Sequence, residues 1–326
     1  MQAVVMRAYG EPAVLQEETV PDPVAGPGSV LVRLEAAALN WHDVLVRRGQ
    51  YASPLPHVPG ADGAGERAGT GERVIIMPSL AWGGRQPAPG EGWEILGDRR
   101  WGTYAELVSV PADCVLPWPA GLDARQAAAL PLTGLTVYRA LFTRGRLTSG
   151  ESLLVLGASG GVATMAVSLA AAAGAHVVVT SASSAKIEAA ADLGAAGGSD
   201  HSQDGWTVQA RELSPRGAGF DLVLDSVGRW AESLDCLRPG GRCVVLGASA
   251  AQQAVLQIRP FYFGQYELIG TTMGSPADMD GLLRFLARHA VPPPVIDQDF
   301  PLSQAAAAHQ RLESADGFGK VILMNR

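Results

Sequence analysis

The feature that most constrains the fold of this chain is a glycine-rich turn between an apolar strand and a helix of small residues. Residues 152–156 read Ser-Leu-Leu-Val-Leu, three glycines follow within residues 157–161, and residues 162–173 are rich in alanine. Further apolar strands and helices alternate along the chain to about residue 289. This alternation predicts parallel βαβ units, and hence an α/β fold with a doubly wound parallel sheet.

The first third of the chain has a different pattern, in which short β-type runs are separated by proline and glycine. These runs are residues 2–6, 29–36, 73–77 and 104–110. A chain of 326 residues also exceeds the usual size of one domain. We therefore expect a β-rich domain ahead of the α/β domain, with residues 114–119 as a linker.

Composition and charge exclude several classes of protein. Hydrophobic residues make up 47% of the chain and charged residues 17%, which is typical of a globular protein. The net charge of −7 argues against nucleic acid and anionic membranes as partners, and no apolar run approaches the roughly 18 residues of a membrane span. The three cysteines form no CxxC pair and no signal peptide is recognisable, so we expect a reduced, cytoplasmic protein.

The glycine turn predicts a dinucleotide-binding site. Glycines let the backbone approach a pyrophosphate, and the N-terminus of the following helix supplies free N–H groups and a partial positive charge. Ala163 stands where a third glycine often packs, and alanine is tolerated there. The predicted phosphate-binding residues are Ala158, Ser159, Gly160, Gly161 and Val162.

The end of the next strand discriminates between NAD and NADP. An NAD site places a carboxylate there for the ribose 2′-hydroxyl, but this chain reads Thr180-Ser-Ala-Ser-Ser-Ala-Lys186 and its next acid is Glu188, on the following helix. Hydroxyls and a cation suit a 2′-phosphate, so we predict NADPH. The alternative is an ordinary serine N-cap followed by a surface lysine. The predicted ligands of the 2′-phosphate are Ser181, Ser183 and Lys186, and the only other lysine of the chain is Lys320.

Together with the glycine turn, six further motifs distributed over nearly the whole chain resemble those of one family. They are Ala38-Leu-Asn-Trp-His-Asp43, Gly49-Gln-Tyr51, Pro59-Gly-Ala-Asp-Gly-Ala-Gly65, Leu130-Pro-Leu-Thr-Gly-Leu-Thr136, Asp225-Ser-Val-Gly228 and Leu237-Arg-Pro-Gly-Gly241. The family is the medium-chain dehydrogenase/reductase superfamily, and the resemblance is to its zinc-free quinone oxidoreductase branch, the zeta-crystallin-like proteins.

The resemblance implies a GroES-like β-barrel catalytic domain and a Rossmann NADP-binding domain. On this expectation the catalytic domain covers residues 1–125 and is completed by residues 275–326, while the Rossmann domain covers residues 126–274. Members of the family are usually homodimers that pair through the edge strand of the Rossmann sheet. Residues 267–272 match that strand.

The same resemblance bears on zinc. Zinc-containing members have a cysteine where Asn40 stands and a histidine where Ala61 stands, and neither replacement is a competent zinc ligand. The structural zinc lobe of such members needs four clustered cysteines, and residues 79–101 contain none. We therefore predict neither a catalytic nor a structural zinc. Without that Lewis acid, simple alcohol oxidation is disfavoured, whereas an electron-poor acceptor such as a quinone or an α,β-unsaturated carbonyl can still take a hydride.

Tyr51 and Asn40 are the predicted catalytic residues. A phenol is protonated at neutral pH and can donate to a carbonyl or an enolate; the spacing of Asn40, Asp43 and Tyr51 looks like that of enoyl-thioester reductases, in which the tyrosine is regarded as the proton donor. Tyr51 as a plain wall of the pocket is the alternative. The resemblance places Asn40 near the nicotinamide, where it would bind a ribose hydroxyl or a substrate oxygen; a turn-forming asparagine is the alternative. We expect Asp43 and Asp62 to be structural, because carboxylates beside turns usually bond local N–H groups.

The family also contacts the nicotinamide end of the cofactor through four further positions. They are Thr133, Gly247, Ala248 and Ser249. The predicted activity is NADPH-dependent reduction of a quinone or enone, with an enoyl-thioester reductase of an acyl or polyketide pathway as the alternative. A non-enzymatic NADPH sensor or RNA-binding module is a third possibility, against which the negative charge and the Tyr51/Asn40 pair both argue.

Overall fold

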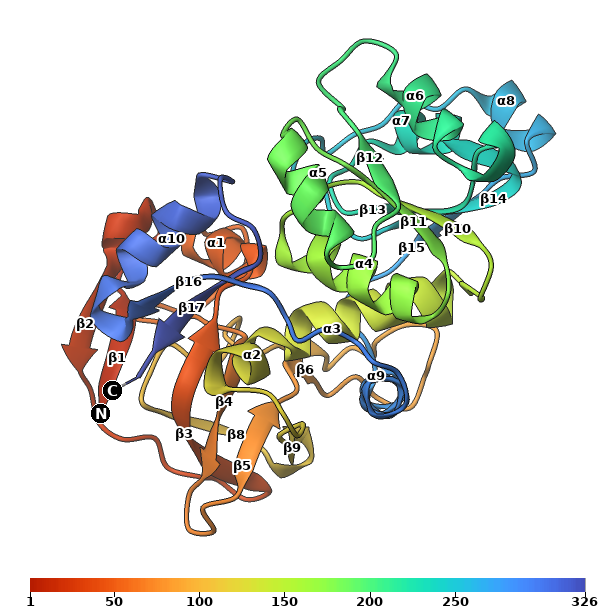
Figure 1. Ribbon diagram of the computed structural model, residues 1–326. Coiled ribbons are helices and arrows are strands. Elements are labelled where there is room, and N and C mark those ends of the chain that lie inside the picture. Colours follow the sequence, from red (N-terminus) through yellow and green to blue (C-terminus); the bar gives the residue numbers. More distant parts are fainter. Residues whose placement is uncertain (326) are drawn as a thin grey trace. The chain divides into compact units, whose positions relative to one another are not determined.

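The computed structural model describes residues 1–325, which form two compact units (Figure 1). The first unit contains residues 1–133, 274–279 and 293–326, and the second contains residues 134–273 and 280–292. The first unit is a β-rich, GroES-like domain and the second is a Rossmann domain with a parallel sheet, so the predicted α/β fold class is confirmed.

A seven-stranded sheet forms the framework of the first unit. Its strands follow the order β16-β17-β3-β4-β5-β9, and β8 also pairs with the long strand β3. The strands are β3 (Ser29–Ala38), β4 (Asp62–Arg67), β5 (Arg73–Ile76), β8 (Leu107–Pro111), β9 (Val115–Pro117), β16 (Ile296–Pro301) and β17 (Lys320–Met324). The last two strands come from the C-terminal part of the chain, so segments far apart in the sequence share this sheet.

The remaining elements of the first unit cover this sheet or form small additions to it. Two antiparallel pairs are β1 (Gln2–Met6) with β2 (Leu15–Thr19), and β6 (Ser79–Leu80) with β7 (Glu94–Ile95). The helices are α1 (Trp41–Arg47), α2 (Ala124–Ala129) and α10 (Ala305–Glu313), with 3-10 turns η1 (Pro12–Val14), η2 (Ala112–Cys114) and η5 (Leu302–Gln304). A buried apolar cluster joins β1, the end of β3, α10 and β17, and this burial stabilises the unit.

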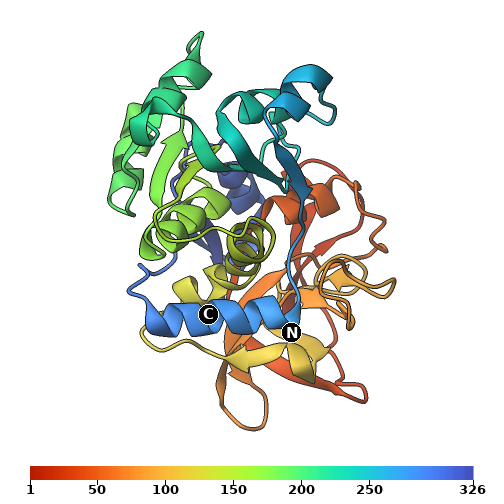
Figure 2. The same ribbon diagram turned by 90° about the vertical axis from the view of Figure 1, so that its right-hand side faces the viewer.

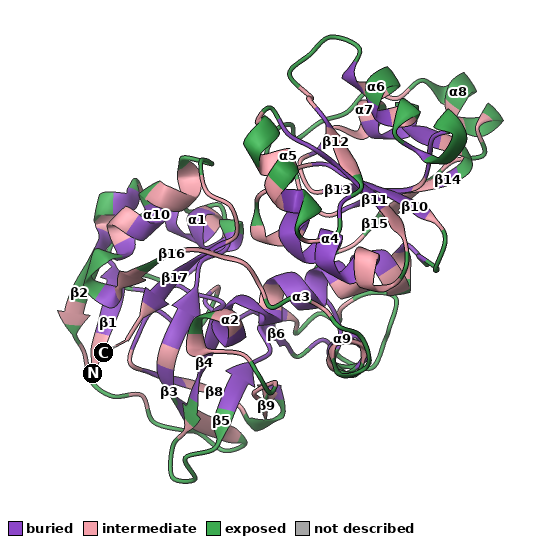
Figure 3. Cartoon of the chain, in the orientation of Figure 1, coloured by how far each residue is buried: buried purple, intermediate pink, exposed green. Residues whose placement is uncertain are grey.

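The second unit is built on six parallel strands in the order β12-β11-β10-β13-β14-β15. They are β10 (Ser152–Val155), β11 (His176–Thr180), β12 (Gly197–Ser199), β13 (Phe220–Asp225), β14 (Leu237–Val245) and β15 (Glu267–Gly270). This is the 3-2-1-4-5-6 order of a Rossmann sheet, in which a ligand binds outside the carboxyl ends of the strands where the order reverses, beside β10. The central strands are almost entirely buried (Figure 3).

Helices connect the strands of the second unit. They are α4 (Gly161–Ala172), α5 (Ser184–Ala191), α6 (Trp206–Glu212), α7 (Trp230–Asp235) and α8 (Ile258–Phe263), with the 3-10 turn η4 (Pro215–Gly217). Ahead of the sheet, α3 (Pro131–Tyr138) continues into a π-helix, η3 (Arg139–Arg144).

The structure corrects two expectations about the chain between these elements. Residues 114–119 are not a free linker, because β9 lies within them and pairs with β5. The helix α9 (Pro276–Arg288), which Figure 2 shows from the side, begins in the first unit and continues in the second. The resemblance implies instead that residues 275–326 all belong to the first unit. The physical reason is aromatic packing, since Phe285 of α9 packs on Phe142 and Tyr138.

Membrane insertion finds no support in the helices. Across residues 1–325 none of them combines the length and the apolar character that crossing a bilayer requires.

Candidate active site

Sheet register brings three polar residues together in the first unit. Ala38, the last residue of β3, is paired with Asp62, the first residue of β4. On the other side, Ile322 of β17 is paired with Ala38 in antiparallel register, which aligns Lys320 with Asn40. Three strands therefore deliver Asn40, Asp62 and Lys320 to the same end of the sheet, although two of these residues are 280 positions apart.

These residues form a buried cluster in which every polar side chain is hydrogen-bonded. The Lys320 ammonium donates to Asn40 Oδ1 at 2.5 Å and to Asp62 Oδ2 at 3.2 Å. Asn40 Nδ2 donates to the same Asp62 oxygen at 2.9 Å and to the Ala38 carbonyl at 3.2 Å. The other Asp62 oxygen accepts from the Leu132 amide at 2.7 Å.

Burial makes the loss of either charge from this cluster costly in stability. Asp62 is fully buried, and Asn40 and Lys320 are each 5% exposed. Burial raises the pKa of the Asp62 carboxyl, whereas the Lys320 charge and the hydrogen bonds from Asn40, Leu132 and Lys320 act in the opposite direction. A buried ion pair of this kind is strongly destabilising when one partner is removed, because the other charge is then left uncompensated.

The residue types at this cluster do not fit a catalytic zinc ion. Ala61 has only a methyl group at the position where the family resemblance implies a zinc ligand, and the Asn40 oxygen and one Asp62 oxygen already accept from an ammonium. Zinc binds thiolate, imidazole or carboxylate, in sites with three or four such ligands. Over residues 1–325 no group of three or more His, Cys, Asp or Glu side chains is arranged to hold a metal ion.

Asp43 anchors the start of α1 beside this cluster. Its Oδ2 accepts from the Asn40 backbone amide at 2.8 Å and from the Tyr104 hydroxyl at 3.1 Å. Because that hydroxyl donates to Asp43, His309 Nε2, 3.2 Å away, donates to the hydroxyl oxygen. Asp43 is fully buried, so its role here is to fix the backbone at Asn40.

Tyr51 lies in the loop after α1 and is half-buried. Its ring packs edge-on against the His42 ring, with 4.8 Å between the ring centroids. Burial, and secondarily the negative charge of Asp98, raises the pKa of the Tyr51 phenol, so it is protonated at neutral pH. This geometry suits a proton donor as well as a wall of the pocket.

Thr133 is buried and its hydroxyl donates to the Ala129 carbonyl at 3.0 Å, which leaves its oxygen as an acceptor. The preceding residue, Leu132, is the one that hydrogen-bonds Asp62. Thr133 is thus attached to the Asn40–Asp62–Lys320 cluster through the backbone.

The predicted phosphate site of the second unit is built from backbone. Gly157 has a φ of +108°, which favours glycine, and its amide donates to Thr180 Oγ1 at 3.0 Å, joining the ends of β10 and β11. Gly160 is exposed and caps α4, and an added Cβ there would meet nothing within 4 Å. The free amides at the start of α4 therefore have open space before them, as a pyrophosphate requires.

The residues predicted to bind the 2′-phosphate follow β11 directly. Ser181 Oγ accepts from the Ser183 amide at 3.1 Å, and Ser183 Oγ accepts from the Lys186 amide at 3.4 Å, which makes Ser183 the N-cap of α5. Lys186 lies in the first turn of that helix. The N-cap and the phosphate interpretations are compatible, because a capped helix start also presents N–H groups to an anion.

Gly247, Ala248 and Ser249 follow β14 beside the end of β13. A Cβ on Gly247 would lie 2.1 Å from the Ser226 carbonyl oxygen, which is too close for any side chain. Only a glycine at position 247 therefore allows the segments after β13 and β14 to approach this closely. Asp225 fixes the neighbouring turn by accepting from the Val227 and Gly228 amides at 2.8 and 2.7 Å. The predicted residues of the second unit thus gather at the carboxyl ends of β10, β11 and β14.

Sequence reasoning missed Lys320 as part of the site. The available signals were the scarcity of lysine and its place at the start of a C-terminal strand. Sequence alone could not give the register that aligns β17 with β3, which is what brings Lys320 to Asn40.

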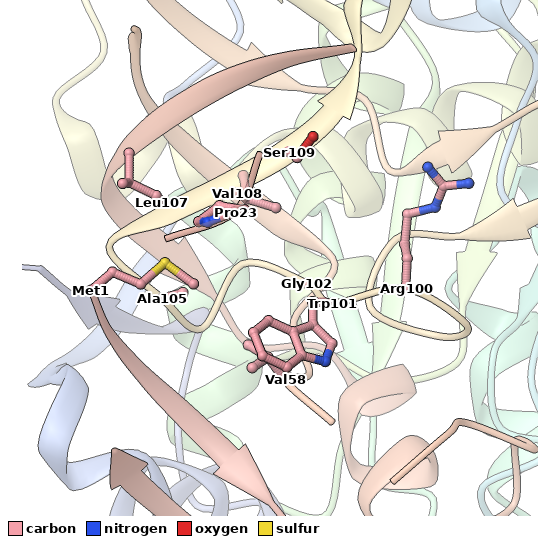
Figure 4. A pocket seen from close by; sticks show the side chains of 10 residues that line it. All are labelled: Met1, Pro23, Val58, Arg100, Trp101, Gly102, Ala105, Leu107, Val108 and Ser109. Carbon is pink, nitrogen blue, oxygen red and sulfur yellow. The ribbon is translucent and has the colours of Figure 1, made fainter. Parts of the chain in front are cut away.

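The structure also has a cavity of about 270 Å³ in the first unit (Figure 4). Its lining is largely apolar and includes Val58, Trp101, Ala105 and Leu107. None of the predicted site residues is among its lining residues, so this cavity is separate from the candidate site.

Comparison with known families matches both units. A family described as zinc-binding dehydrogenase matches residues 161–288, and the alcohol dehydrogenase GroES-like domain matches residues 26–120. Both descriptions agree with the fold of the unit that they match.

Individual proteins match over nearly the whole chain. A quinone oxidoreductase of Pseudomonas aeruginosa is 32% identical over 97% of both chains. A zinc-type alcohol dehydrogenase-like protein of Schizosaccharomyces pombe is 30% identical over 94% of both. A solved structure described as an NAD-dependent alcohol dehydrogenase is 36% identical, covers 100% of both chains and superimposes with a TM-score of 0.94.

Proposed function

The chain belongs to the medium-chain dehydrogenase/reductase superfamily, and we propose that it is a zinc-independent, NADPH-dependent reductase of quinones or α,β-unsaturated carbonyls. That it is an oxidoreductase of this superfamily follows from its relatives; the acceptor, the cofactor and the zinc independence are our proposal. The observation that carries it is the Asn40–Asp62–Lys320 cluster, in which a lysine ammonium holds the oxygen atoms that a metal would need.

The class of acceptor follows from that observation. Without a Lewis acid the protein cannot strongly polarise a simple alcohol or ketone. Conjugation in a quinone or an enone spreads the charge of an arriving hydride, so positioning and one hydrogen-bond donor suffice. Quinone oxidoreductases among the relatives support this choice over the enoyl-thioester alternative.

The second unit suits a bound dinucleotide, which would supply the hydride. The amides at the start of α4 would hold its pyrophosphate, and the loop at Gly247 would lie along its nicotinamide end. Serine hydroxyls and Lys186 after β11, with no carboxylate before the exposed Glu188, favour NADPH over NADH. One solved relative is described as NAD-dependent, so the cofactor preference needs a direct test.

Tyr51 would supply the proton. Its phenol is protonated at neutral pH, and among the described residues its hydroxyl has no hydrogen-bond partner, which leaves it available to the oxygen of an acceptor. Hydride transfer to a quinone or an enone would leave a quinol monoanion or an enolate that lacks one proton. Tyr51 would donate that proton, to the oxygen of the quinol monoanion or to the enolate, and the tyrosinate would regain a proton from solvent.

One assay tests the proposed function. Purified protein treated with a chelator is given a quinone, a simple enone and crotonyl thioester side by side, with NADPH or NADH. We expect turnover of the quinone or the enone with NADPH, unchanged by the chelator. Turnover only of the thioester would favour the alternative acceptor, and restoration of a chelator-sensitive activity by zinc would refute zinc independence.

We also propose a homodimer formed through β15, the edge strand of the Rossmann sheet. Close to this strand in the sequence, α8 and the preceding segment expose large apolar side chains, and α8 is drawn as exposed in Figure 3. These side chains are Val255, Ile258, Tyr262 and Phe263. Light scattering should give twice the mass of 33.9 kDa, and Ile258→Asp with Phe263→Asp should shift it to the monomer; a monomeric wild type would refute the proposal.

A further inference from the structure

The hydrogen-bonding capacity of Asn40 can be accounted for atom by atom. Its two N–H groups are used on the Asp62 carboxylate and the Ala38 carbonyl, and its oxygen accepts from the Lys320 ammonium. An amide has two N–H donors and an oxygen with two lone pairs. The capacity that remains is therefore a single lone pair on Oδ1.

The charges around Asn40 fix this orientation. Turning the amide over would place its NH₂ group against the Lys320 ammonium and its oxygen against the Asp62 carboxylate and the Ala38 carbonyl. All three hydrogen bonds would then become contacts between like groups. The orientation is thus set by neighbours of known polarity, and above all by Lys320, the only cation among them.

We infer that Lys320 is a positioning residue that makes Asn40 a dedicated hydrogen-bond acceptor, so that Asn40 binds a hydroxyl or amide N–H of the cofactor and not the oxygen of the reducible substrate. The inference rests on the proposed function for the identity of the cofactor. The two predicted catalytic residues then have different roles. Asn40 accepts a hydrogen bond from the cofactor, and Tyr51 donates one to the substrate oxygen. This role of Lys320 also explains why a long cation is buried here at 5% exposure, where lysine is rarely found.

Two double variants separate this role from simple charge balance. Lys320→Met alone leaves the Asp62 carboxylate buried without a counter-ion and is expected to unfold readily. Asp62→Asn with Lys320→Met removes both charges together and keeps an acceptor for the Leu132 amide. Asn40→Asp with Asp62→Asn exchanges the amide and the carboxylate, so that Lys320 keeps its counter-ion and position 40 remains an acceptor, with the loss of the hydrogen bond to the Ala38 carbonyl.

The expected NADPH affinities differ between Asp62→Asn with Lys320→Met, the charge-free pair, and Asn40→Asp with Asp62→Asn, the exchanged pair. The charge-free pair should melt within a few degrees of wild type but bind NADPH about five-fold more weakly, the loss of one oriented neutral hydrogen bond, with kcat nearly unchanged. The exchanged pair should keep NADPH affinity within about three-fold, because it still presents an acceptor. Affinity is measured by NADPH fluorescence, and KM and kcat by turnover with a quinone.

Two outcomes would overturn the inference. Wild-type NADPH affinity in the charge-free pair would make Lys320 a counter-ion only. Loss of kcat with unchanged NADPH affinity in the exchanged pair would show that the Asn40 N–H groups serve the substrate oxygen.

A measurement on the wild type separates failure of the inference from failure of the proposed function. The chain holds two asparagines, Asn40 and Asn325, so ¹⁵N-asparagine labelling gives two side-chain amides. Both Asn40 N–H protons should exchange slowly with and without NADPH, and Asn325, which also donates to two carbonyls, is the internal reference. NADPH should change the chemical shifts of the Asn40 side-chain amide without speeding its exchange. Rapid exchange would refute the orientation itself, whereas slow exchange with unchanged shifts, in protein that binds NADPH by fluorescence, would refute the contact between Asn40 and the cofactor but not the proposed function.

Discussion

The two units build their candidate sites from different materials. In the Rossmann unit the glycine turn uses consecutive residues and backbone amides, with Gly157 and Gly160 providing conformation and open space. In the GroES-like unit the cluster uses the side chains of Asn40, Asp62 and Lys320, of which the last two begin strands and Asn40 follows the end of β3. A site made of backbone tolerates many side-chain changes, whereas a buried side-chain cluster loses its balance with one.

The largest expected effect tests whether a side chain in the first unit performs chemistry. Tyr51→Phe removes only the hydroxyl and keeps the ring that packs on His42. If Tyr51 donates the proton, kcat should fall about 10²- to 10⁴-fold with little change in NADPH affinity. Steady-state turnover with a quinone or enone and a fluorescence titration with NADPH measure the two quantities.

The pH profile gives this prediction a second check. A donor must be protonated, and the pKa of Tyr51 is raised above its ordinary value near 10 by burial and by Asp98. Activity of the wild type should therefore show no loss from this group between neutrality and about pH 10. Tyr262→Phe on the exposed helix α8 is the matched control; a Tyr51→Phe enzyme that keeps half of its turnover would leave Tyr51 as a wall of the pocket.

The next prediction concerns the stability of the first unit at low pH, which should depend on the buried His309. Burial lowers the pKa of His309 to about 4, below its unfolded value near 6.5, so the folded state excludes a proton that the unfolded chain accepts. The full stability is present above pH 6.5 and is lost as the pH falls towards 4, by about 3 kcal/mol. Denaturant unfolding between pH 7 and 4 should show this loss in wild type and a smaller one in His309→Gln.

The control for this prediction is His176→Gln, since His176 starts strand β11 in the Rossmann unit and is only partly buried. That variant should keep the wild-type slope of stability against pH. Equal slopes in wild type and His309→Gln would show that His309 is not the group responsible.

The same contrast explains what sequence could predict. The turn at Gly157 and the serines before Lys186 are local, so strand, turn and helix patterns were enough to place them. The fold class and the family also followed from motifs along the chain. Lys320 could not be assigned to the site, because its contact with Asn40 depends on the register of β17 against β3, and register is a property of the assembled sheet.

The two corrected expectations about the fold also arise from contacts between residues that are distant in the sequence. Residues 114–119 have a composition typical of a loop but contain a strand, since β5 offers an edge for β9 to pair with. The helix α9 follows its aromatic partner Phe142 rather than the expected boundary at residue 275. In both cases the structure of the segment depends on a partner far away in the sequence. A local sequence pattern carries no information about such a partner.

The backbone-built site can be challenged with a side chain that leaves the fold intact. Gly160 has a φ of −71° and open space at its Cβ position, so Gly160→Val should melt at nearly the wild-type temperature. The valine would occupy the space before α4 where the pyrophosphate docks, and NADPH affinity should fall about ten-fold or more. Calorimetry and fluorescence titration measure both, and undiminished affinity would place the pyrophosphate elsewhere.

The smallest expected effect decides the cofactor. Lys186→Ala removes a partly buried cation from the first turn of α5, beside the serines that follow β11. Because the lysine is only partly buried, solvent still screens its contact with a 2′-phosphate, and the KM for NADPH should rise about five- to ten-fold while that for NADH stays unchanged. Ser184→Ala, in the same turn of α5, is the matched control.

The scarcity of lysine makes this last prediction unusually direct. The chain contains only Lys186 and Lys320, so a lysine-labelled sample gives two side-chain signals. NADPH should move the Lys186 signal and NADH should not, because only NADPH carries the 2′-phosphate. Equal movement with both cofactors, or an equal rise of both KM values in Lys186→Ala, would mean that the serines after β11 act only as the cap of α5 and that the enzyme does not select NADPH through this loop.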